Sequence, residues 1–357
     1  MMIKNISLLV LLIWLYSGTL TVTYASNDVS KYTLTQEKVD AIKQFWPSVQ
    51  QDSFQTADGV TIAYAANFSR ADQPYIVIVP GRSESYLKYQ ELIYDLDQQG
   101  YDSVVIDHRG QGLSTRLTRN RLQGYVAQFD HYAQDLQQLL AQVLPAKYPA
   151  HHQQSFMLAH SMGGAIALRY LQLYPNQVKA VSLTSPMIAI KSAGLPIAVA
   201  KFFVKMGNQL NQWLSDTPWY FIGQSDNNST SFADNRLMHS AERYQRFQNL
   251  YQQQPELKLG GVTFHWLAQA IDTNDKLFMA LDKLSMPIQV LQAGDEVIVD
   301  NAAQDAFCQQ LHAMYPHSCP DGKAITLAGA YHELLFEADQ YRDITLAASL
   351  AWFAQHQ

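Results

Sequence analysis

Residues 155–172 read SFMLAHSMGGAIALRYLQ, and this stretch decides the fold of the chain. Residues 156–158 form a short apolar run with the length of a buried strand, and from Ala165 onward apolar residues recur at helical spacing. Ser161 is therefore expected at a sharp strand-to-helix corner, the nucleophile elbow usually written Gly-x-Ser-x-Gly. The helix that begins beside such a serine offers free N–H groups and a positive dipole end to a developing anion. The stretch thus predicts a nucleophilic serine.

One residue departs from the elbow pattern. Ala159 occupies the position of the first glycine, so the motif reads Ala-His-Ser-Met-Gly. Small side chains are needed on both sides of the serine because strand and helix pass close together, and alanine adds a single methyl group. We interpret Ala159 as a tolerated variant.

Size and composition limit the classes of protein. The chain has 357 residues, of which 48% are hydrophobic and 16% charged, enough to bury a large core in two domains or in one α/β domain with an insertion. Its net charge is −6 and it has no basic run, which argues against a nucleic-acid partner because phosphate binding requires clustered Lys and Arg.

The N-terminus has the pattern of an export signal over residues 1–25. Lys4 supplies the positive start, residues 6–16 are almost all apolar, and Ala25 ends a small-residue cleavage site before Ser26. The sequence predicts a periplasmic or secreted protein. The apolar run is shorter than the ~20 residues that span a bilayer, so an uncleaved anchor at the inner membrane is the alternative reading.

The two cysteines suit an oxidising compartment. Cys308 and Cys319 are eleven positions apart (319 − 308) across a loop that contains Pro and Gly. We expect them to form a small disulfide, with two unpaired thiols as the alternative.

Strand and helix patterns alternate along most of the chain. Residues 59–64 alternate like an early antiparallel strand, and the buried-strand runs that follow are 74–79, 104–106, 156–158, 180–185, 287–292 and 324–327. Helical patterns separate these runs at short spacing. The sequence therefore predicts an α/β fold with a mostly parallel sheet covered on both faces.

The alternation is interrupted between residues 186 and 286. This segment is helical and rich in aromatic residues, and no buried-strand run divides it. We interpret it as a helical lid inserted in a core formed by residues 26–185 and 287–357. Residues 27–55 are polar with scattered aromatics and are expected to form an extension that packs on the core.

A catalytic serine requires a base and an acid that fixes the tautomer of the base. After Ser161, His332 follows the last strand and a glycine turn, so it is the expected base. Asp295 and Glu296 follow the strand at 287–292; because neighbouring side chains point in different directions, only one of them should reach the histidine. Asp300 is interpreted as the N-cap of the next helix.

The tetrahedral intermediate needs two preorganised N–H donors. The peptide N–H of Met162 is one candidate, and that of Arg82, in the turn after the strand at 74–79, is the other. The side chains of Arg82 and Glu84 are expected to brace that turn. Asp107 and Arg109 are interpreted as an ion pair that holds the next strand-end turn.

No cofactor or metal is expected. The histidines and carboxylates lack the His-Glu-x-x-His spacing, and no glycine-rich phosphate loop follows a strand. The sequence says nothing about the oligomeric state.

Six segments together resemble a known family: GRSESYLKY (81–89), IDHRGQGLS (106–114), AHSMGG (159–164), LGGVTFHW (259–266), LQAGDEVIVDN (291–301) and GAYHE (329–333). The chain is similar over residues 50–355 to the bacterial lysophospholipases of the PldB type, within the monoacylglycerol lipase group of α/β-hydrolases. The resemblance implies an α/β-hydrolase fold and a serine esterase that acts on single-acyl lipids. It implies Ser161 as nucleophile and His332 as base, and the lid then offers a surface for peripheral membrane contact.

The resemblance also bears on the acid. In the family the acid lies four residues before the aspartate that starts the following helix; with Asp300 in that place, it is Glu296. Aspartate is the usual residue there, which keeps Asp295 as the alternative. Pro80 stands where many monoacylglycerol lipases have histidine, and the export signal is not general in the group.

Other functions remain open at this stage. A carboxylesterase or acyltransferase acting on soluble esters would use the same residues. A hydrolase-fold binding protein without activity is supported only by Ala159 and by the ambiguous acid. For an aminopeptidase, nothing in the sequence marks a site for a free amine.

Overall fold

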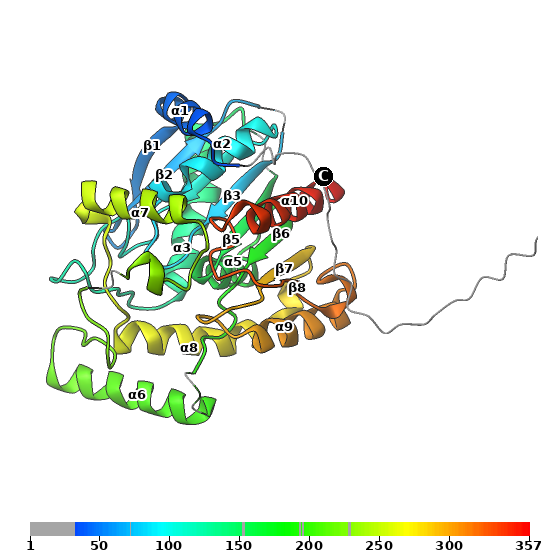
Figure 1. The fold of residues 1–357 in the computed structure, drawn as a ribbon. Helices are drawn as coiled ribbons and strands as arrows, with labels where there is room; N and C mark the ends of the chain where they lie inside the picture. Colours follow the sequence, from blue (N-terminus) through cyan, green and yellow to red (C-terminus); the bar gives the residue numbers. More distant parts are fainter. Residues whose placement is uncertain (1–32, 72, 152–153, 193, 195, 228–229) are drawn as a thin grey trace, which may run out of the picture.

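A computed structural model describes residues 33–71, 73–151, 154–192, 194, 196–227 and 230–357. Within these residues, eight strands form one sheet in the order β1-β2-β4-β3-β5-β6-β7-β8 (Figure 1). The β1/β2 and β2/β4 pairs are antiparallel and every later pair is parallel. The strands are β1 (Gln50–Gln55), β2 (Thr61–Asn67), β3 (Tyr75–Val79), β4 (Ser103–Ile106), β5 (Ser155–His160), β6 (Val178–Thr184), β7 (Ile288–Ala293) and β8 (Ile325–Leu327).

Helices connect the strands and cover the sheet. They are α1 (Gln36–Phe45), α2 (Gln90–Gln98), α3 (Asp130–Gln138), α4 (Leu144–Lys147), α5 (Met162–Leu173), α6 (Ile197–Leu214), α7 (Ala241–Gln253), α8 (Phe264–Met279), α9 (Asn301–Met314) and α10 (Asp339–Gln355). The 3₁₀ turn η2 (Tyr86–Tyr89) leads into α2, and the π-helical turn η3 (Leu139–Val143) joins α3 to α4.

The core lies on both faces of the sheet because alternate side chains of a strand point to opposite sides. On one face, residues such as Val77 and Met157 pack with α3, α5, α8 and α9. On the other, residues such as Ile76 and Phe156 pack with α2 and α10. The predicted α/β-hydrolase fold, a mostly parallel sheet with helices on both faces, is confirmed. The predicted strands occur within a few residues of their expected limits.

The segment 33–55, expected to be an extension, forms regular secondary structure. It contains α1, the 3₁₀ turn η1 (Trp46–Ser48) and the edge strand β1. Thr35 caps α1 through its side chain, and Val39 and Ile42 face the body of the protein. β1 was not predicted because all its side chains except Phe54 are polar and almost all are exposed, so it has no apolar alternation.

The segment between β6 and β7 carries α6, α7 and α8, and α6 stands away from the sheet beside α8 (Figure 1). Two ion pairs of 2.6 Å attach α6 to α8, Lys201–Asp275 and Lys205–Asp272. The function of this segment as a lid stays a prediction.

Among the described helices, none is both long enough and apolar enough to cross a membrane. The predicted export signal at residues 1–25 lies outside the described residues.

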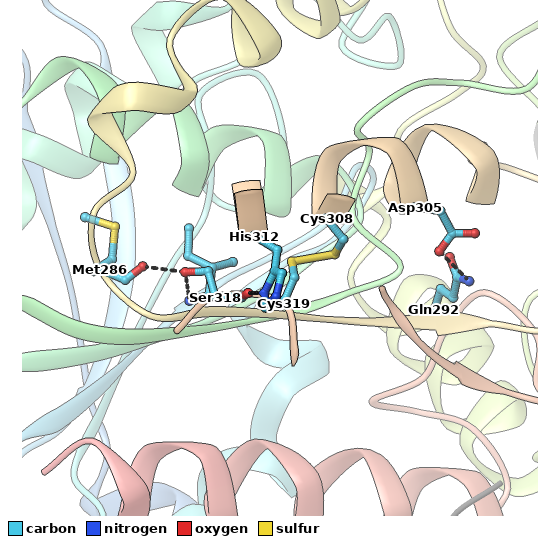
Figure 2. Close-up of a disulfide and its surroundings, with 8 residues drawn as sticks. Met286, Gln292, Asp305, Cys308, His312, Ser318 and Cys319 are labelled. Carbon is cyan, nitrogen blue, oxygen red and sulfur yellow. Dashed lines mark hydrogen bonds between the residues drawn. A yellow bond between two sulfur atoms is a disulfide. The ribbon is translucent and has the colours of Figure 1, made fainter. Parts of the chain in front are cut away.

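The predicted disulfide is present. Cys308 in α9 and Cys319 are bonded, with their Cα atoms 5.3 Å apart (Figure 2). The neighbouring Ser318 Oγ donates to the carbonyl of Met286 at 3.1 Å, and the Cys319 N–H donates to the carbonyl of Ile288 at 2.7 Å. The bridge therefore ties α9 to the beginning of β7, at the end of that strand opposite to residue 293.

Candidate active site

Ser161 lies at a strained corner between β5 and α5. Its φ of +52° and ψ of −120° are unusual for a residue with a side chain, and such strain is common where a side chain must be presented for function. The helix approaches the neighbouring strand closely: a Cβ on Gly163 would lie 2.0 Å from the Val79 carbonyl oxygen. Glycine is thus required at 163. The buried Ala159 is accommodated at the end of β5, where it pairs with Val79 and Leu183.

The structure brings Ser161, His332 and Glu296 together. Ser161 Oγ lies 2.9 Å from His332 Nε2, and His332 Nδ1 lies 2.7 Å from Glu296 Oε2. The serine follows β5, the glutamate follows β7 and the histidine follows β8, so all three lie at the carboxyl edge of the sheet. A serine, a ring that can accept its proton and a carboxylate that orients the ring form one continuous hydrogen-bonded chain.

Glu296 is held as an anion. Its Oε1 accepts the peptide N–H groups of Val297, Ile298 and Val299 at 2.8, 2.7 and 3.3 Å. Burial acts to raise the pKa of Glu296, but the hydrogen bond and the charge of His332, together with these N–H donors, bring it below its usual value.

Asp295 does not reach the histidine. Its side chain is exposed, and its peptide N–H donates to the carbonyl of Ala330 at 3.0 Å. Asp300 caps α9 as predicted, because its carboxylate accepts the N–H of Ala302 at 2.9 Å.

The two expected N–H donors lie in adjoining turns: Met162 begins α5, and a Cβ on Gly163 would lie 2.5 Å from the carbonyl oxygen of Pro80, just before Arg82. Among the described residues, the peptide N–H groups of Arg82 and Met162 have no acceptor. The neighbouring peptide groups are restrained: Gly81 donates to the carboxylate of Glu84, and the Gly81 carbonyl accepts Gln111 Nε2 at 2.8 Å. The Arg82 N–H is therefore held in a fixed turn beside the elbow, in the position where an oxyanion hole is expected.

The Arg82 side chain bonds the segment between β6 and β7. Its Nη2 donates to the carbonyls of Gly260 and Gly261, both at 2.8 Å, and the guanidinium lies 5.2 Å from the ring centroid of Trp266. Burial lowers the pKa of Arg82 to about 10, which still leaves it charged at neutral pH. The expectation that this side chain braces its loop holds, and the partner is the segment between β6 and β7.

The expected ion pair between Asp107 and Arg109 is wrong. Arg109 instead pairs with Asp135 at 2.6 Å and with Asp58 at 2.8 Å. The Asp107 carboxylate accepts hydrogen bonds from the residues of two adjoining turns, the Ser85 hydroxyl and the peptide N–H of Leu113 among them, at 2.9 and 2.7 Å. Asp107 thus supports the loop that carries Arg82, but through these hydrogen bonds and not through an ion pair with Arg109.

Sequence reasoning missed a buried charge cluster behind the serine and the histidine. In the described part of the chain, the ligand-type atoms of Glu84, His160 and Glu333 lie within 4.8 Å of one another. The ammonium of Lys88 lies between the two carboxylates and bonds both. A divalent cation would have to displace this ammonium, so the cluster does not fit a metal site as it stands. The only sequence signal was that its members lie in the segments that carry the family resemblance.

A family model and two relatives match most of the chain. A family model described as serine aminopeptidase, S33, matches residues 71–339. The lysophospholipase L2 of Escherichia coli K12 is 35% identical over 88% of this chain and 90% of its own length. The probable lysophospholipase L2 of Haemophilus influenzae is 31% identical over 75% of this chain and 79% of its own length.

Solved structures of low sequence identity share the fold. A soluble variant of monoglyceride lipase from Saccharomyces cerevisiae superposes with a TM-score of 0.66 at 18% identity, covering 87% of this chain and 94% of its own. The monoacylglycerol lipase of Paleococcus ferrophilus gives a TM-score of 0.60 at 17% identity, covering 87% of this chain and 99% of its own.

Proposed function

We propose that the chain, which belongs to the serine aminopeptidase S33 family and is related to the lysophospholipase L2 proteins, cleaves the acyl ester of lysophospholipids or monoacylglycerols. It is a serine ester hydrolase. The observation that carries the proposal is the chain of hydrogen bonds from Ser161 through His332 to Glu296. The relatives supply the substrate class, because their names describe lysophospholipases and monoglyceride lipases.

The mechanism follows from the roles that these atoms can take. His332 Nε2 accepts the Ser161 proton as Oγ attacks the acyl carbonyl carbon, and Glu296 stabilises the imidazolium that forms. The N–H groups of Arg82 and Met162 stabilise the oxyanion. The C–O bond to the glycerol oxygen then breaks, His332 gives its proton to that oxygen, and an acyl-serine remains. A water molecule that loses a proton to His332 hydrolyses the acyl-serine, which releases the fatty acid and returns the proton to Ser161.

We further propose that α6 contacts a lipid surface. The apolar side chains of α6 face outward in large part; Trp213 is 75% exposed and Phe202 61%. A single-acyl lipid resides in membranes or micelles, so an exposed apolar helix would bring the enzyme to its substrate. The exposed apolar side chains of α6 are Ile197, Val199, Phe202, Phe203, Met206, Leu210, Trp213 and Leu214.

Vesicle binding tests this contact. The double variant Phe202→Ser and Trp213→Ser should lose sedimentation with phosphatidylglycerol-containing vesicles and keep its activity on a short nitrophenyl ester. Met279→Ser removes an apolar side chain that is 80% exposed at the end of α8, and should bind like the wild type. Equal sedimentation of all three proteins would refute the contact.

We also propose that the protein is exported and cleaved before Ser26. The disulfide between Cys308 and Cys319 supports an oxidising compartment. Cell fractionation with N-terminal sequencing tests this: a protein that begins at Ser26 outside the cytoplasm agrees with export. A protein that retains residues 1–25 at the membrane favours the anchored alternative, and one in the cytoplasm contradicts both.

The substrate is tested by comparing 1-acyl lysophosphatidylcholine, monoacylglycerol and a short nitrophenyl ester, with Ser161→Ala as the control. Turnover of a long-chain single-acyl lipid that vanishes in Ser161→Ala agrees with the proposal. Turnover of short esters only would indicate a general carboxylesterase, and transfer to an added alcohol would indicate an acyltransferase.

A further inference from the structure

Lys88 forms a buried bridge between two loops of the active site. Its ammonium bonds the carboxylates of Glu84 and Glu333, the latter at 2.7 Å, and each of the three residues is less than 9% exposed. The rings of Phe247 and Phe336 cover the ammonium, with centroids 4.7 and 4.3 Å away. The bridge is therefore shielded from water. In such a buried environment the attraction between opposite charges is stronger, and removing one partner is more costly.

The two carboxylates of the bridge each contact a residue next to a group of the active site. Glu84 accepts the N–H of Gly81, the residue before the Arg82 donor, and the hydroxyl of Tyr89 at 2.6 Å. Glu333 directly follows His332, and its Oε2 lies 3.6 Å from Nε2 of His160, the residue before the serine. Glu84 and Lys88 lie four residues apart in the turn that ends in η2, whereas Lys88 and Glu333 are 245 residues apart.

We propose that Lys88, Glu84 and Glu333 are positioning residues that set the separation between the loop carrying the Arg82 N–H and the loop carrying His332. The proposal rests on the proposed function, because it takes Arg82 and His332 to be the oxyanion donor and the base. The proposal gives a role to Glu84 and Lys88 in the segment 81–89 and to Glu333 in the segment 329–333, which take no part in the mechanism above.

The physical reason is the repulsion that Lys88 cancels. Without the ammonium, two buried carboxylates would face each other within 4.8 Å. Like charges at this separation either move apart or take up a proton. Movement would displace the Arg82 N–H relative to His332, and a misplacement of about 1 Å at a reacting centre can cost ~100-fold in rate.

The native charge state favours the bridge. Burial acts to lower the pKa of Lys88, but the charges of Glu333 and Glu84 outweigh it and raise that pKa above its usual value. The same cation helps to lower the pKa of Glu84 to about 2 against the effect of burial. Lys88 and Glu84 are therefore both charged at neutral pH.

The experiment compares two buried lysines. Lys88→Met removes the bridge, and Glu333→Gln releases only its link to the histidine loop. Lys38→Met is the matched control, because Lys38 is also buried and bonds Asp95 at 2.7 Å in an ionic cluster that does not include the site. The readouts are the rate of labelling by a fluorophosphonate, which reports the reactivity of Ser161 with any substrate, the kcat and KM for the best ester, and the Tm.

We expect Lys88→Met to be labelled ~10- to 100-fold more slowly, with kcat reduced to the same degree and KM little changed, as for a residue that acts in the transition state. Glu333→Gln should be labelled ~5-fold or more slowly, and Lys38→Met within about twofold of wild type even though its Tm falls.

Two results would overturn the proposal: wild-type labelling of a folded Lys88→Met, or an equal loss in Lys38→Met. If Lys88→Met does not fold, Glu333→Gln decides, and its labelling at the wild-type rate overturns the proposal. The proposed function fails separately, when the wild type is labelled but cleaves no single-acyl lipid.

Discussion

Replacing Glu296 by glutamine keeps the shape of the side chain but replaces one acceptor oxygen of the carboxylate by a donor NH2 group. Oε1 accepts three peptide N–H groups, so an oxygen must stay in that position. The new amide nitrogen must then occupy the Oε2 position, 2.7 Å from His332 Nδ1. Two N–H groups cannot face each other there, so His332 must shift its proton to Nε2 and accept the amide at Nδ1.

This tautomer places an N–H, not a lone pair, toward Ser161 Oγ at 2.9 Å. The histidine can then no longer take the serine proton. The same change of tautomer costs about 10⁴-fold in kcat in the Ser-His-Asp template. We therefore expect Glu296→Gln to lose ~10³- to 10⁴-fold in kcat with little change in KM and in Tm.

Asp295→Asn is the matched control, because it makes the same chemical change at the neighbouring, exposed carboxylate. Steady-state kinetics on a nitrophenyl ester, with circular dichroism melting of each variant, measure the effect. We expect Asp295→Asn to stay within about threefold of the wild type, as surface substitutions usually do. A loss in Asp295→Asn equal to that in Glu296→Gln, or a fully active Glu296→Gln, would refute the reasoning.

Three further predictions concern stability. The double variant Cys308→Ser and Cys319→Ser should lose roughly 3 kcal/mol of unfolding free energy and keep its kcat, because the bridge lies at the end of β7 opposite to the active site. Urea unfolding with and without reductant tests this, and a loss of kcat without a loss of stability would contradict it. Gly163→Ala should fail to fold or lose its activity, because its Cβ would lie 2.0 Å from the Val79 carbonyl oxygen; soluble expression at the wild-type level with full labelling by fluorophosphonate would contradict it. Burial acts to raise the pKa of Glu91, but the charge of Arg342 and other cations hold it at about 2, so the stability that Glu91 contributes is present above its unfolded pKa of about 4.5 and is lost as the pH falls toward 2. In Glu91→Gln, the free energy of unfolding measured in urea should therefore change less between pH 5 and pH 3 than in the wild type, and an equal change in both proteins would contradict this.

Local sequence predicted the strands and the elbow because each is set by a short stretch. A parallel strand buried on both faces is a continuous apolar run, as at Tyr75–Val79, whatever the rest of the chain does. The strained corner at Ser161 likewise needs only a strand, two small residues and a helix. The edge strand β1 was missed because Gln50–Gln55 is exposed and carries no such pattern.

Apart from the contact of Ser161 with His332, which the order of the strands indicates, the side-chain contacts between distant segments of the site could not be predicted. The residues themselves left Asp295 and Glu296 open, because only the turn at 297–299 decides which carboxylate faces His332. Arg109 was assigned to the nearest acid, but its partners come from elsewhere in the chain, and so does the link between Lys88 and Glu333. Which charged residues pair inside a fold depends on which segments the topology brings together, and spacing along the sequence does not show this.

Trapping the acyl-enzyme tests the central claim most directly. Wild type and Ser161→Ala are mixed with a long-chain 1-acyl lysophosphatidylcholine, quenched in acid within the first turnovers and mapped by peptide mass spectrometry, while the released fatty acid is measured in parallel. The account predicts an acyl group on the peptide that contains Ser161 in the wild type, and neither adduct nor fatty acid with Ser161→Ala. Release of fatty acid by Ser161→Ala at the wild-type rate, an adduct on another residue, or no adduct and no release by the wild type would contradict it.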